Sequence, residues 1–216
     1  MDAFIEITAD GSNTLFVPSL DEHYHSIKGA RTESQHIFID RGMKYSDVSA
    51  PQVLEIGFGT GLNAFLTLLA AGQLDREIHY TAIERYPLPW ETVERLQYSD
   101  TLLFRMLHDA VWNTEVTITP YFVLHKIEDD FTRYTFTKMY DVVYFDAFAP
   151  EKQPEMWSRQ RFEYLHGIMN EGGVLTTYCS KGAIRRMLQD VGFTVERLPG
   201  PPGGKREMLR AKKSTV

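Results

Sequence analysis

The chain of 216 residues contains a single cysteine, Cys179. One thiol cannot form an internal disulfide, and it leaves no thiolate cluster for a metal site. Cys179 lies in the apolar stretch "GGVLTTYCS", where a small buried side chain is the ordinary interpretation and a reactive thiol the rarer one. We therefore expect Cys179 to pack in the core.

The sequence also lacks the features of an exported or membrane-spanning chain. No apolar run reaches the roughly 18 residues that indicate a spanning helix. The N-terminus "MDAFIEITADG" lacks the basic start and the continuous apolar stretch of a secretory signal. With 43% hydrophobic and 24% charged residues, the composition is that of an ordinary globular protein. We expect one domain, no membrane partner and a cytoplasmic location.

An excess of positive charge is absent too, because 23 basic residues face 29 acidic ones and the net charge is -6. The net charge therefore gives no indication of a nucleic-acid-binding protein. The basic residues are nevertheless clustered, first at Lys181, Arg185 and Arg186 and then at Lys205, Arg206, Arg210, Lys212 and Lys213. Such a cluster could contact phosphates, although a frayed and solvated tail explains the second group equally well.

Strand and helix patterns alternate from Gln52 onward, after an N-terminal segment of different character. In that segment, residues 1–45, "QHIFID" (35–40) is a short strand candidate. Strands are expected at 52–57, 77–85, 115–127 (interrupted or ended near Pro120), 140–148 and 173–179, with helices at 61–73, 89–98, 100–111, 154–173 and 180–192. The end of the chain reads as two strands joined by "PGPPGGK". This order predicts an α/β protein with a mostly parallel sheet, a Rossmann-like core over residues 46–216 and a C-terminal β-hairpin.

A glycine-rich turn lies between the first of these strands and its helix, in "VLEIGFGTGLN". Gly57, Gly59 and Gly61 let the backbone turn sharply and leave its amides uncovered at the helix start. The spacing differs from the dinucleotide fingerprint G-x-G-x-x-G. Glu55 precedes the turn, and its carboxylate would repel a phosphate but could hold an ammonium group, directly or through water. A tight turn without a ligand remains the alternative.

Glu84 ends the next strand, 27 residues beyond Gly57. At that position an acidic side chain can accept hydrogen bonds from both hydroxyls of a ribose, although it could also be a solvated strand end. Together with the acid before the glycine turn, it indicates a nucleoside that carries an amino acid, as S-adenosylmethionine does.

With these residues the chain resembles the class I S-adenosylmethionine-dependent methyltransferases. More narrowly, the stretches "FDAFAPEKQPEMW", "GGVLTTYCSKGAIRRML", "GFTVERLPGPPGGKREML", "SLDEHYHS" and "TESQHIFI" resemble the methyltransferase part of the MnmC family, which modifies the wobble uridine of certain tRNAs. The resemblance covers nearly the whole chain. The glycine turn is common to many methyltransferases, whereas D-A-F-A-P followed by P-E-M-W is far more specific.

The resemblance implies methylation of the primary amine of 5-aminomethyl-2-thiouridine in tRNA, with S-adenosyl-L-methionine as cofactor and the anticodon region as the expected contact. It also implies a seven-stranded sheet with helices on both faces. Carried over to this sequence, the cofactor contacts would be Glu55, Gly57, Phe58, Gly59, Gly61, Asn63 and Glu84. Bifunctional members continue into a flavin-dependent oxidoreductase domain. This sequence stops at Val216, so we expect a stand-alone enzyme that needs its aminomethyl substrate from another enzyme.

Asp146 ends the strand "YDVVYF" and is the expected catalytic residue. Ligands of open α/β sheets bind outside the carboxyl ends of the strands, where this side chain would lie. An attacking amine must be neutral and becomes a cation as it accepts the methyl group. A carboxylate beside it can hold it in line, stabilise the developing charge and take the proton. The alternative is a structural cap or strand end.

Substrate contacts are expected from the N-terminal residues Tyr24, His25 and Glu33, which match the family's opening motif and could close the pocket. A histidine such as His25 is more often structural than functional. Phe148 and Trp157 could offer an aromatic face to the base or could pack in the core. The prolines Pro150 and Pro154 would stiffen the loop between them.

Adenine recognition departs from the usual class I pattern. Many members carry Gly-Asp after the third strand, with the Asp on the adenine amine, whereas Lys126 and Ile127 stand at the corresponding place in "HKIEDDF". Backbone groups, Glu128 or Asp129 are the alternatives, and the sequence does not choose among them.

Other functions remain open on the sequence alone. A small-molecule amine methyltransferase would keep the cofactor and change the acceptor, and the acidic net charge mildly favours it. A non-catalytic nucleotide-binding or RNA-binding module would keep the glycine turn without turnover. A dinucleotide oxidoreductase is least favoured because the third glycine has the wrong spacing.

Overall fold

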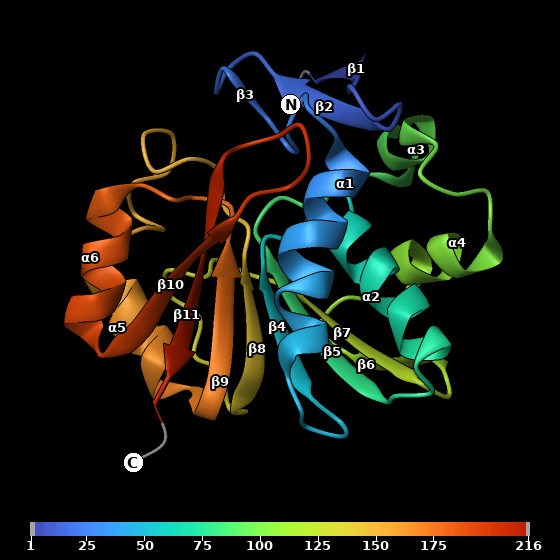
Figure 1. Ribbon diagram of the computed structural model, residues 1–216. Coiled ribbons are helices and arrows are strands. Elements are labelled where there is room, and N and C mark those ends of the chain that lie inside the picture. The colour runs from blue at the N-terminus through green and yellow to red at the C-terminus, as the bar shows by residue number, and fades with distance from the viewer. Residues whose placement is uncertain (1–2, 215–216) are drawn as a thin grey trace.

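The computed structural model describes residues 3–214 and is built on an eight-stranded sheet (Figure 1). Its strands are β4 (Gln52–Ile56), β5 (Ile78–Glu84), β6 (Glu115–Thr119), β7 (Phe122–Glu128), β8 (Tyr140–Phe145), β9 (Met169–Thr177), β10 (Phe193–Pro199) and β11 (Glu207–Lys213). They lie in the order β10-β11-β9-β8-β4-β5-β7-β6. The neighbours β9, β8, β4, β5 and β7 are parallel, while β6 and β11 pair antiparallel with their neighbours.

Strand β4 sits between β5 and β8 and is the point where the chain changes direction across the sheet. From β4 the chain builds outward through β5 on one side and later returns to add β8 on the other. In open parallel sheets such a switch point leaves a crevice at the carboxyl ends of the strands. Every residue of β8 is buried, as expected for a strand covered on both faces.

Helices cover both faces of the sheet (Figure 1). One face carries α2 (Leu62–Gln73) and α4 (Leu102–Asp109), with α3 (Trp90–Val93) and the 3-10 turn η3 (Glu94–Leu96) nearby; the other carries α5 (Arg159–Gly167) and α6 (Gly182–Val191). Consecutive residues of β4 alternate between the two cores, since Val53 packs with the first group and Leu54 with the second. Cys179 packs in the second core, as expected.

The N-terminal segment forms a small antiparallel sheet that lies beyond the carboxyl ends of the parallel strands (Figure 1). Its strands are β1 (Phe4–Ile7), β2 (Asn13–Val17) and β3 (Glu22–His23), and they are followed by α1 (Ala30–Ser34), the π-helix η1 (Gln35–Asp40) and the 3-10 turn η2 (Met43–Tyr45). Ile37 and Phe38 of η1 belong to the same core as α2. The segment is therefore joined to the main sheet through shared apolar packing.

The prediction of a strand at residues 35–40 is wrong. "QHIFID" continues α1 as a π-helix, and its final turn is closed by the bond from the Arg41 N–H to the His36 carbonyl. A helix satisfies its backbone groups internally, so the apolar residues can enter the core without a partner strand. Phe38 uses this geometry to pack against Tyr144 of β8 at a centroid distance of 5.2 Å.

The sheet has one strand more than the expected seven. The segment 115–127 is a hairpin of β6 and β7, which pair antiparallel across the turn at Pro120 and Tyr121. A proline has no N–H to donate to a ladder, and the chain turns at it instead of continuing. The helices on both faces and the C-terminal hairpin of β10 and β11 are confirmed.

The helix expected over residues 154–173 is shorter, because α5 ends at Gly167 and β9 begins at Met169. The pair Gly172 and Gly173 lies inside β9, beside a shift in its register with β8. Gly172 has a φ of +75°, a conformation that suits glycine. These glycines therefore mark an irregular strand and not a helix stop.

The basic C-terminal residues are not a frayed tail over residues 207–213, which form β11. The Arg210 guanidinium lies 3.4 Å from the centre of the Tyr45 ring and is paired with Glu196. The Lys213 ammonium donates to two backbone carbonyl oxygens, those of His166 and Met169. Among residues 3–214, no helix is long and apolar enough to cross a membrane.

Candidate active site

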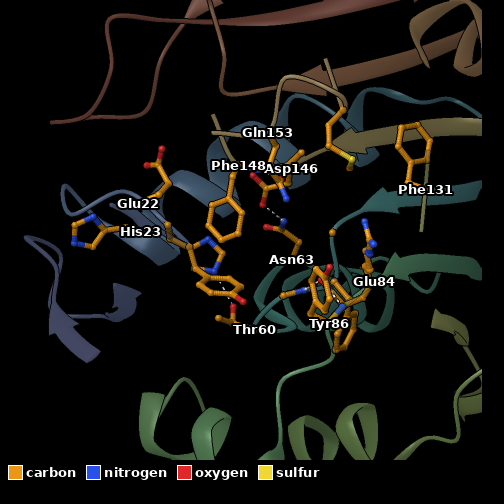
Figure 2. A pocket seen from close by; sticks show the side chains of 18 of the residues that line it. Glu22, His23, Thr60, Asn63, Glu84, Tyr86, Phe131, Asp146, Phe148 and Gln153 are labelled. Carbon is orange, nitrogen blue, oxygen red and sulfur yellow. Dashed lines mark hydrogen bonds between the residues drawn. The ribbon is translucent and has the colours of Figure 1, made fainter. Parts of the chain in front are cut away.

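A cavity of about 440 Å³ opens at the carboxyl ends of β4, β5, β7 and β8. The loops that follow these strands form its floor, and the N-terminal segment covers it (Figure 2). Of the twelve candidate site residues chosen from sequence, ten line this cavity: Tyr24, His25, Glu33, Gly57, Phe58, Gly59, Asn63, Glu84, Asp146 and Phe148. The structure thus brings together residues spread over more than half of the chain.

The glycine turn after β4 has the backbone conformation that its sequence requires. Gly57 and Gly59 have φ angles of +93° and +49°, where residues with a side chain are strained. A Cβ at Gly59 would lie 3.1 Å from the Tyr24 ring. The turn therefore passes closely beneath the N-terminal cover, and α2 begins directly after it.

Glu84 fixes the turn from the end of β5. Its Oε2 accepts the Gly59 N–H at 3.0 Å, and its Oε1 accepts the Tyr86 N–H at 2.8 Å. Glu84 and Tyr86 lie together at one end of the pocket (Figure 2). Because carboxylate oxygens have further lone pairs, Glu84 retains acceptor capacity toward the cavity.

Asp146 follows β8 and is half-buried at the opposite end of the glycine turn. Its Oδ2 accepts a hydrogen bond of 2.8 Å from the Asn63 side-chain amide of α2 (Figure 2). Burial, and then the negative charge of Glu33, raise the pKa of this carboxyl to about 7, against the opposing effects of Asn63 and Lys205. Near neutral pH it can therefore both accept and release a proton.

Glu33 reaches the cavity from α1 and is buried. Its Oε1 accepts the Ser26 N–H at 3.1 Å. Desolvation raises the pKa of Glu33, while the bond from Ser26 and the charge of Lys205 oppose that shift. The cavity thus holds two carboxyl groups whose ionised forms disfavour one another.

His25 is a structural tie between the N-terminal cover and the glycine turn. Its Nε2 lies 2.7 Å from the Thr60 hydroxyl, and the ring is buried. Burial lowers the pKa of His25 to about 4, so the ring is neutral at physiological pH. A neutral ring suits a structural hydrogen bond to Thr60 better than a role in proton transfer.

The aromatic residues divide between the cavity and the core. Tyr24 and Phe148 both line the cavity and meet edge to face at 5.1 Å. Trp157 does not, because it is buried against Phe145, and its indole N–H donates to the Phe148 carbonyl at 2.7 Å. Trp157 therefore supports the loop, and an aromatic face from it toward a ligand is excluded in this structure.

Two candidates from the sequence lie outside the lining. Gly61 caps the start of α2 with a φ of +74°. Glu55 is completely buried, because alternation along β4 turns its side chain toward the α2 face of the sheet. Glu55 does not line the cavity itself, and its contact with an ammonium group, directly or through water, stays a prediction.

The lining also contains residues that were not expected from the sequence, among them Tyr86, Tyr178 and Lys205. The Tyr178 hydroxyl donates to the Ala147 carbonyl at 2.8 Å, next to Asp146. The Lys205 ammonium lies 4.1 Å from the centre of the Tyr178 ring. The only sequence signal for them was their place in stretches such as "GGKREML", because nothing in the spacing links the loop at 200–206 to the strand ends.

At the third strand end, Asp129 lines the cavity and Glu128 does not. Lys126 is buried away from the opening, where its ammonium donates to the His108 carbonyl and lies 4.7 Å from the Trp112 ring. Of the two acidic residues left open by the sequence, only Asp129 is placed to meet a ligand.

Residues 75–214 match a family model described as S-adenosyl-L-methionine-dependent methyltransferase. The chain belongs to this family. The matched region includes Glu84 and Asp146 and begins after the glycine turn. The family assignment therefore does not depend on the turn, which is an independent sign of the same chemistry.

Curated relatives of this methyltransferase are named tRNA 5-methylaminomethyl-2-thiouridine biosynthesis bifunctional protein MnmC. The protein from Burkholderia mallei (strain SAVP1) is 31% identical over 222 residues, which cover 91% of this chain and 33% of the relative. The protein from Burkholderia thailandensis is 30% identical over 219 residues, with the same coverage of both. The chain spans about a third of the length of these relatives.

Solved structures share the fold of the methyltransferase. MNMC2 from Aquifex aeolicus has a TM-score of 0.80 at 23% identity, over 100% of this chain and 71% of that one. Spermidine synthase from Thermotoga maritima has a TM-score of 0.62 at 13% identity, over 100% and 73% of the two chains. These likenesses confirm the predicted Rossmann-like methyltransferase fold.

The cofactor of the family is S-adenosyl-L-methionine, and the residues present fit it. A cavity of about 440 Å³ falls in the range of small-molecule sites, roughly 300–1,000 Å³. Its donor set is acidic and polar, with Glu84 beside the glycine turn and no phosphate-binding lysine within the turn. This chemistry suits a ligand that carries hydroxyl and cationic groups.

Proposed function

We propose that this methyltransferase acts on the primary amine of 5-aminomethyl-2-thiouridine in tRNA and produces the methylaminomethyl form. The names of the relatives, at 31% identity over 91% of the chain, support this acceptor. The observation that carries the proposal is Asp146, a half-buried carboxyl with a raised pKa where the cofactor turn meets the N-terminal cover. A carboxyl of this kind can accept the proton that amine methylation releases.

The cofactor end of the cavity is assigned to the glycine turn and Glu84. Glu84 accepts hydrogen bonds from ribose hydroxyls, while Gly57 and Gly59 allow close approach of the methionine part to the backbone. Asp129 is the acidic candidate for the adenine amine. When bound, the cofactor supplies an electrophilic methyl group on a sulfonium.

Asp146 and Glu33 define the acceptor end. An amine must lose a proton to be nucleophilic, and the product nitrogen must lose another after methylation. With its pKa near 7, Asp146 is partly ionised at neutral pH and accepts such a proton from an amine within hydrogen-bond reach. Its negative charge, with that of Glu33 nearby, stabilises the nitrogen as it becomes cationic.

Aromatic side chains suit the acceptor base. Tyr24, Phe148 and Tyr178 line the same cavity as Asp146. Single-stranded bases are commonly bound by stacking on such rings, and a wobble nucleoside turned out of its anticodon loop offers a free face. We therefore assign the anticodon region of tRNA to the open side of the cavity. We also assign the production of the aminomethyl group to a separate cytoplasmic enzyme.

The test is mass spectrometry of nucleosides from tRNA that carries 5-aminomethyl-2-thiouridine, after incubation with enzyme and cofactor. We expect a gain of one methyl group on that nucleoside only. tRNA with unmodified wobble uridine is the control and should gain none. Methyl transfer to free small amines but not to tRNA would contradict the proposal and indicate a small-molecule methyltransferase.

A further inference from the structure

Tyr24 lies where the cofactor side of the cavity meets the acceptor side. It follows β3 in the N-terminal cover and lines the cavity together with the glycine turn and Asp146. Its ring lies against Gly59 of the turn and meets the ring of Phe148, on the loop after Asp146, at a centroid distance of 5.1 Å. Tyr24 therefore joins the loop that follows β4 to the loop that follows β8.

The tyrosine ring approaches the turn with one edge. A Cβ placed at Gly59 would lie 3.1 Å from Cδ1 and 3.2 Å from Cε1 of Tyr24, and no other atom of the ring comes within 4 Å of it. A ring lying flat on the turn would bring its neighbouring carbons within that distance as well. The plane of the ring therefore stands across the turn. Because Tyr24 lines the cavity, a ligand bound beside the turn meets this ring.

The ring is held in place by its own backbone and by the next residue. The Tyr24 N–H donates to the Leu15 carbonyl at 2.9 Å, and His25 Nε2 lies 2.7 Å from the Thr60 hydroxyl within the turn. The contact with Phe148 restricts the ring further. A side chain that is fixed before a ligand arrives loses little conformational freedom on binding. The position of the ring is thus set in advance.

The phenol of Tyr24 is neutral. Desolvation, and then the negative charge of Glu84, raise the pKa of its hydroxyl above the usual value. The ring therefore acts through its faces and not through an anionic oxygen. An aromatic face carries negative charge density and attracts a cation that lies within about 6 Å of the ring centre.

Three other aromatic side chains of the lining are placed differently from Tyr24. Phe58 and Phe131 are buried in the two cores on either face of the sheet. Tyr86 is exposed and lies beside Glu84, at the end of the cavity assigned to the ribose (Figure 2). These rings do not stand between the cofactor side and the acceptor side.

The two rings on the acceptor side are also engaged differently. The Tyr178 ring already holds the Lys205 ammonium, 4.1 Å from its centre. Phe148 belongs to the acceptor loop, and none of its atoms comes within 4 Å of a Cβ placed at Gly59. Tyr24 is the ring that touches the turn at this position.

The cofactor of the family brings a cation to this junction, because its methyl group is carried by a sulfonium. Methyl transfer requires the sulfonium and the acceptor nitrogen to meet in line, so the charged sulfur belongs at the border between the two sides of the cavity. We propose that a face of the Tyr24 ring holds this positive charge, and that Tyr24 is a specificity-determining residue that favours the methylated cofactor over its demethylated product, S-adenosyl-L-homocysteine.

The contact changes during the reaction. As the C–S bond breaks and the C–N bond forms, the positive charge passes from sulfur to nitrogen, and the attraction between sulfur and ring is lost. The ring therefore retains the cofactor before transfer and favours release of the product after it. Tyr24 is thereby assigned to the cofactor, and Phe148 and Tyr178 remain for the acceptor base.

The placing of the acceptor beside Asp146 rests on the proposed function. Discrimination by charge does not, because it is measured with the cofactor and its product alone, without tRNA. Other charges in the cavity act on the same cation: acids that attract it and bases that repel it, namely Glu22, Glu33, Glu84, Asp129, Asp130, Asp146, Glu155, Arg85 and Lys205. The experiment must therefore isolate the ring from these groups.

The first test measures the dissociation constants of S-adenosyl-L-methionine and S-adenosyl-L-homocysteine by calorimetry with the full chain. Position 24 carries tyrosine, phenylalanine in Tyr24→Phe, and then a difluorophenylalanine and pentafluorophenylalanine introduced by codon suppression. Fluorine nearly keeps the shape of the ring but withdraws electron density from its faces. Tyr24→Phe should keep the ratio of the two constants within about twofold.

The fluorinated rings should lower the preference for the charged cofactor stepwise, by roughly 3- to 30-fold over the series. The acids and bases of the cavity are unchanged throughout, so only the charge density of the ring varies. A ratio of the two constants that stays the same from phenylalanine to pentafluorophenylalanine would overturn the proposal.

The second test removes the ring. Tyr24→Leu should weaken S-adenosyl-L-methionine roughly 3- to 30-fold more than S-adenosyl-L-homocysteine. Tyr86→Leu is the matched control, because Tyr86 lines the ribose end, which both ligands share, and it should weaken both equally. An equal loss of preference in the two variants would assign the discrimination to the cavity as a whole and contradict the role of Tyr24. If Tyr24→Leu does not fold, the fluorinated series decides, since it nearly keeps the shape of the ring.

Transfer to tRNA distinguishes the sulfonium from the acceptor ammonium as the cation at the ring. If fluorination raises the KM for tRNA at saturating cofactor and leaves the ratio of the two dissociation constants unchanged, the acceptor ammonium lies at Tyr24 and the proposal is wrong. If no tRNA is methylated, yet the preference for the charged cofactor falls across the series, the proposed acceptor fails and the role of Tyr24 stands.

Discussion

The Asn63 amide nitrogen lies 2.8 Å from the Asp146 carboxylate, and this bond joins residues 83 positions apart in the chain. It ties the first turn of α2, which follows the glycine turn, to the end of β8. The bond places the acceptor-side carboxyl against the cofactor-side helix. Changes on either side are therefore expected to affect methyl transfer.

Asp146→Asn is expected to keep the cofactor affinity within a few-fold and to lower methyl transfer by roughly 10²-fold or more, since proton acceptance and charge stabilisation are both lost. Calorimetry and single-turnover transfer to tRNA measure the two effects. Asp190→Asn, on the exposed face of α6, is the matched control and should transfer normally. Normal turnover in Asp146→Asn would remove its catalytic role.

The pH dependence follows from the same carboxyl. Because the pKa of Asp146 is about 7, the ionised form is depleted below neutral pH, and the transfer rate should fall as pH drops from 8 to 6. The rate is measured with saturating cofactor and tRNA. The residual activity of Asp146→Asn should no longer fall between pH 8 and 6. If the rate of this variant falls as in the wild type, the pH dependence belongs to another group.

Gly59→Ala tests the glycine turn. The left-handed φ of +49° and a Cβ 3.1 Å from the Tyr24 ring should reduce the free energy of unfolding by roughly 1–2 kcal/mol and weaken cofactor binding. Gly72→Ala is the control in the adjacent helix, where no atom lies within 4 Å of the added Cβ. It should stabilise the protein by up to about 1 kcal/mol. Equal effects of both substitutions in denaturant unfolding would contradict this interpretation of the turn.

Lys126 should make the free energy of unfolding depend on pH in the alkaline range. Burial lowers its pKa from 10.5 to about 8, so between these values the unfolded chain binds more protons than the folded one. The free energy of unfolding should therefore rise with pH across this window, by roughly 3 kcal/mol at most from this group. Lys126→Met should lack that rise, while exposed Lys44→Met should keep it; urea unfolding at pH 7.5 and 10 measures the difference.

Lys205 and Arg206 are exposed in the loop at 200–206, and Lys205 lines the cavity. If tRNA phosphates contact them, affinity should fall as salt rises, and Lys205→Gln or Arg206→Gln should reduce the slope of log K against log salt by about 1 each. Lys44→Gln is the control, because it lies before the amino end of β4, away from the cavity. A slope that none of these variants changes would place the phosphate contacts elsewhere.

Local patterns in the sequence predicted the central strands, most helices and the cofactor turn, because each depends on neighbouring residues. The errors arose where a distant partner decided the outcome. Residues 35–40 read as a strand, yet packing of Phe38 against Tyr144 favours a π-helix. The glycines of β9 read as a helix stop, yet they lie at a shifted register beside β8.

The acceptor end of the cavity could be predicted only in part. Asp146 was identifiable because it ends a buried strand, whereas Tyr178 and Lys205 meet it through a loop that folds back from the C-terminal hairpin. Asn63 was counted among the cofactor contacts, but its bond to Asp146 depends on how α2 lies on the sheet.

By itself, the sequence determined the order of strands and helices, the glycine turn and the acids at the strand ends. Alternation along β4 established that neighbouring residues face opposite sides, but not which side faces the opening. Only the tertiary structure turned Glu55 inward and raised the pKa of Asp146 toward neutrality. Burial and neighbouring charge are set by residues far apart in the chain, and these decide the protonation of the site.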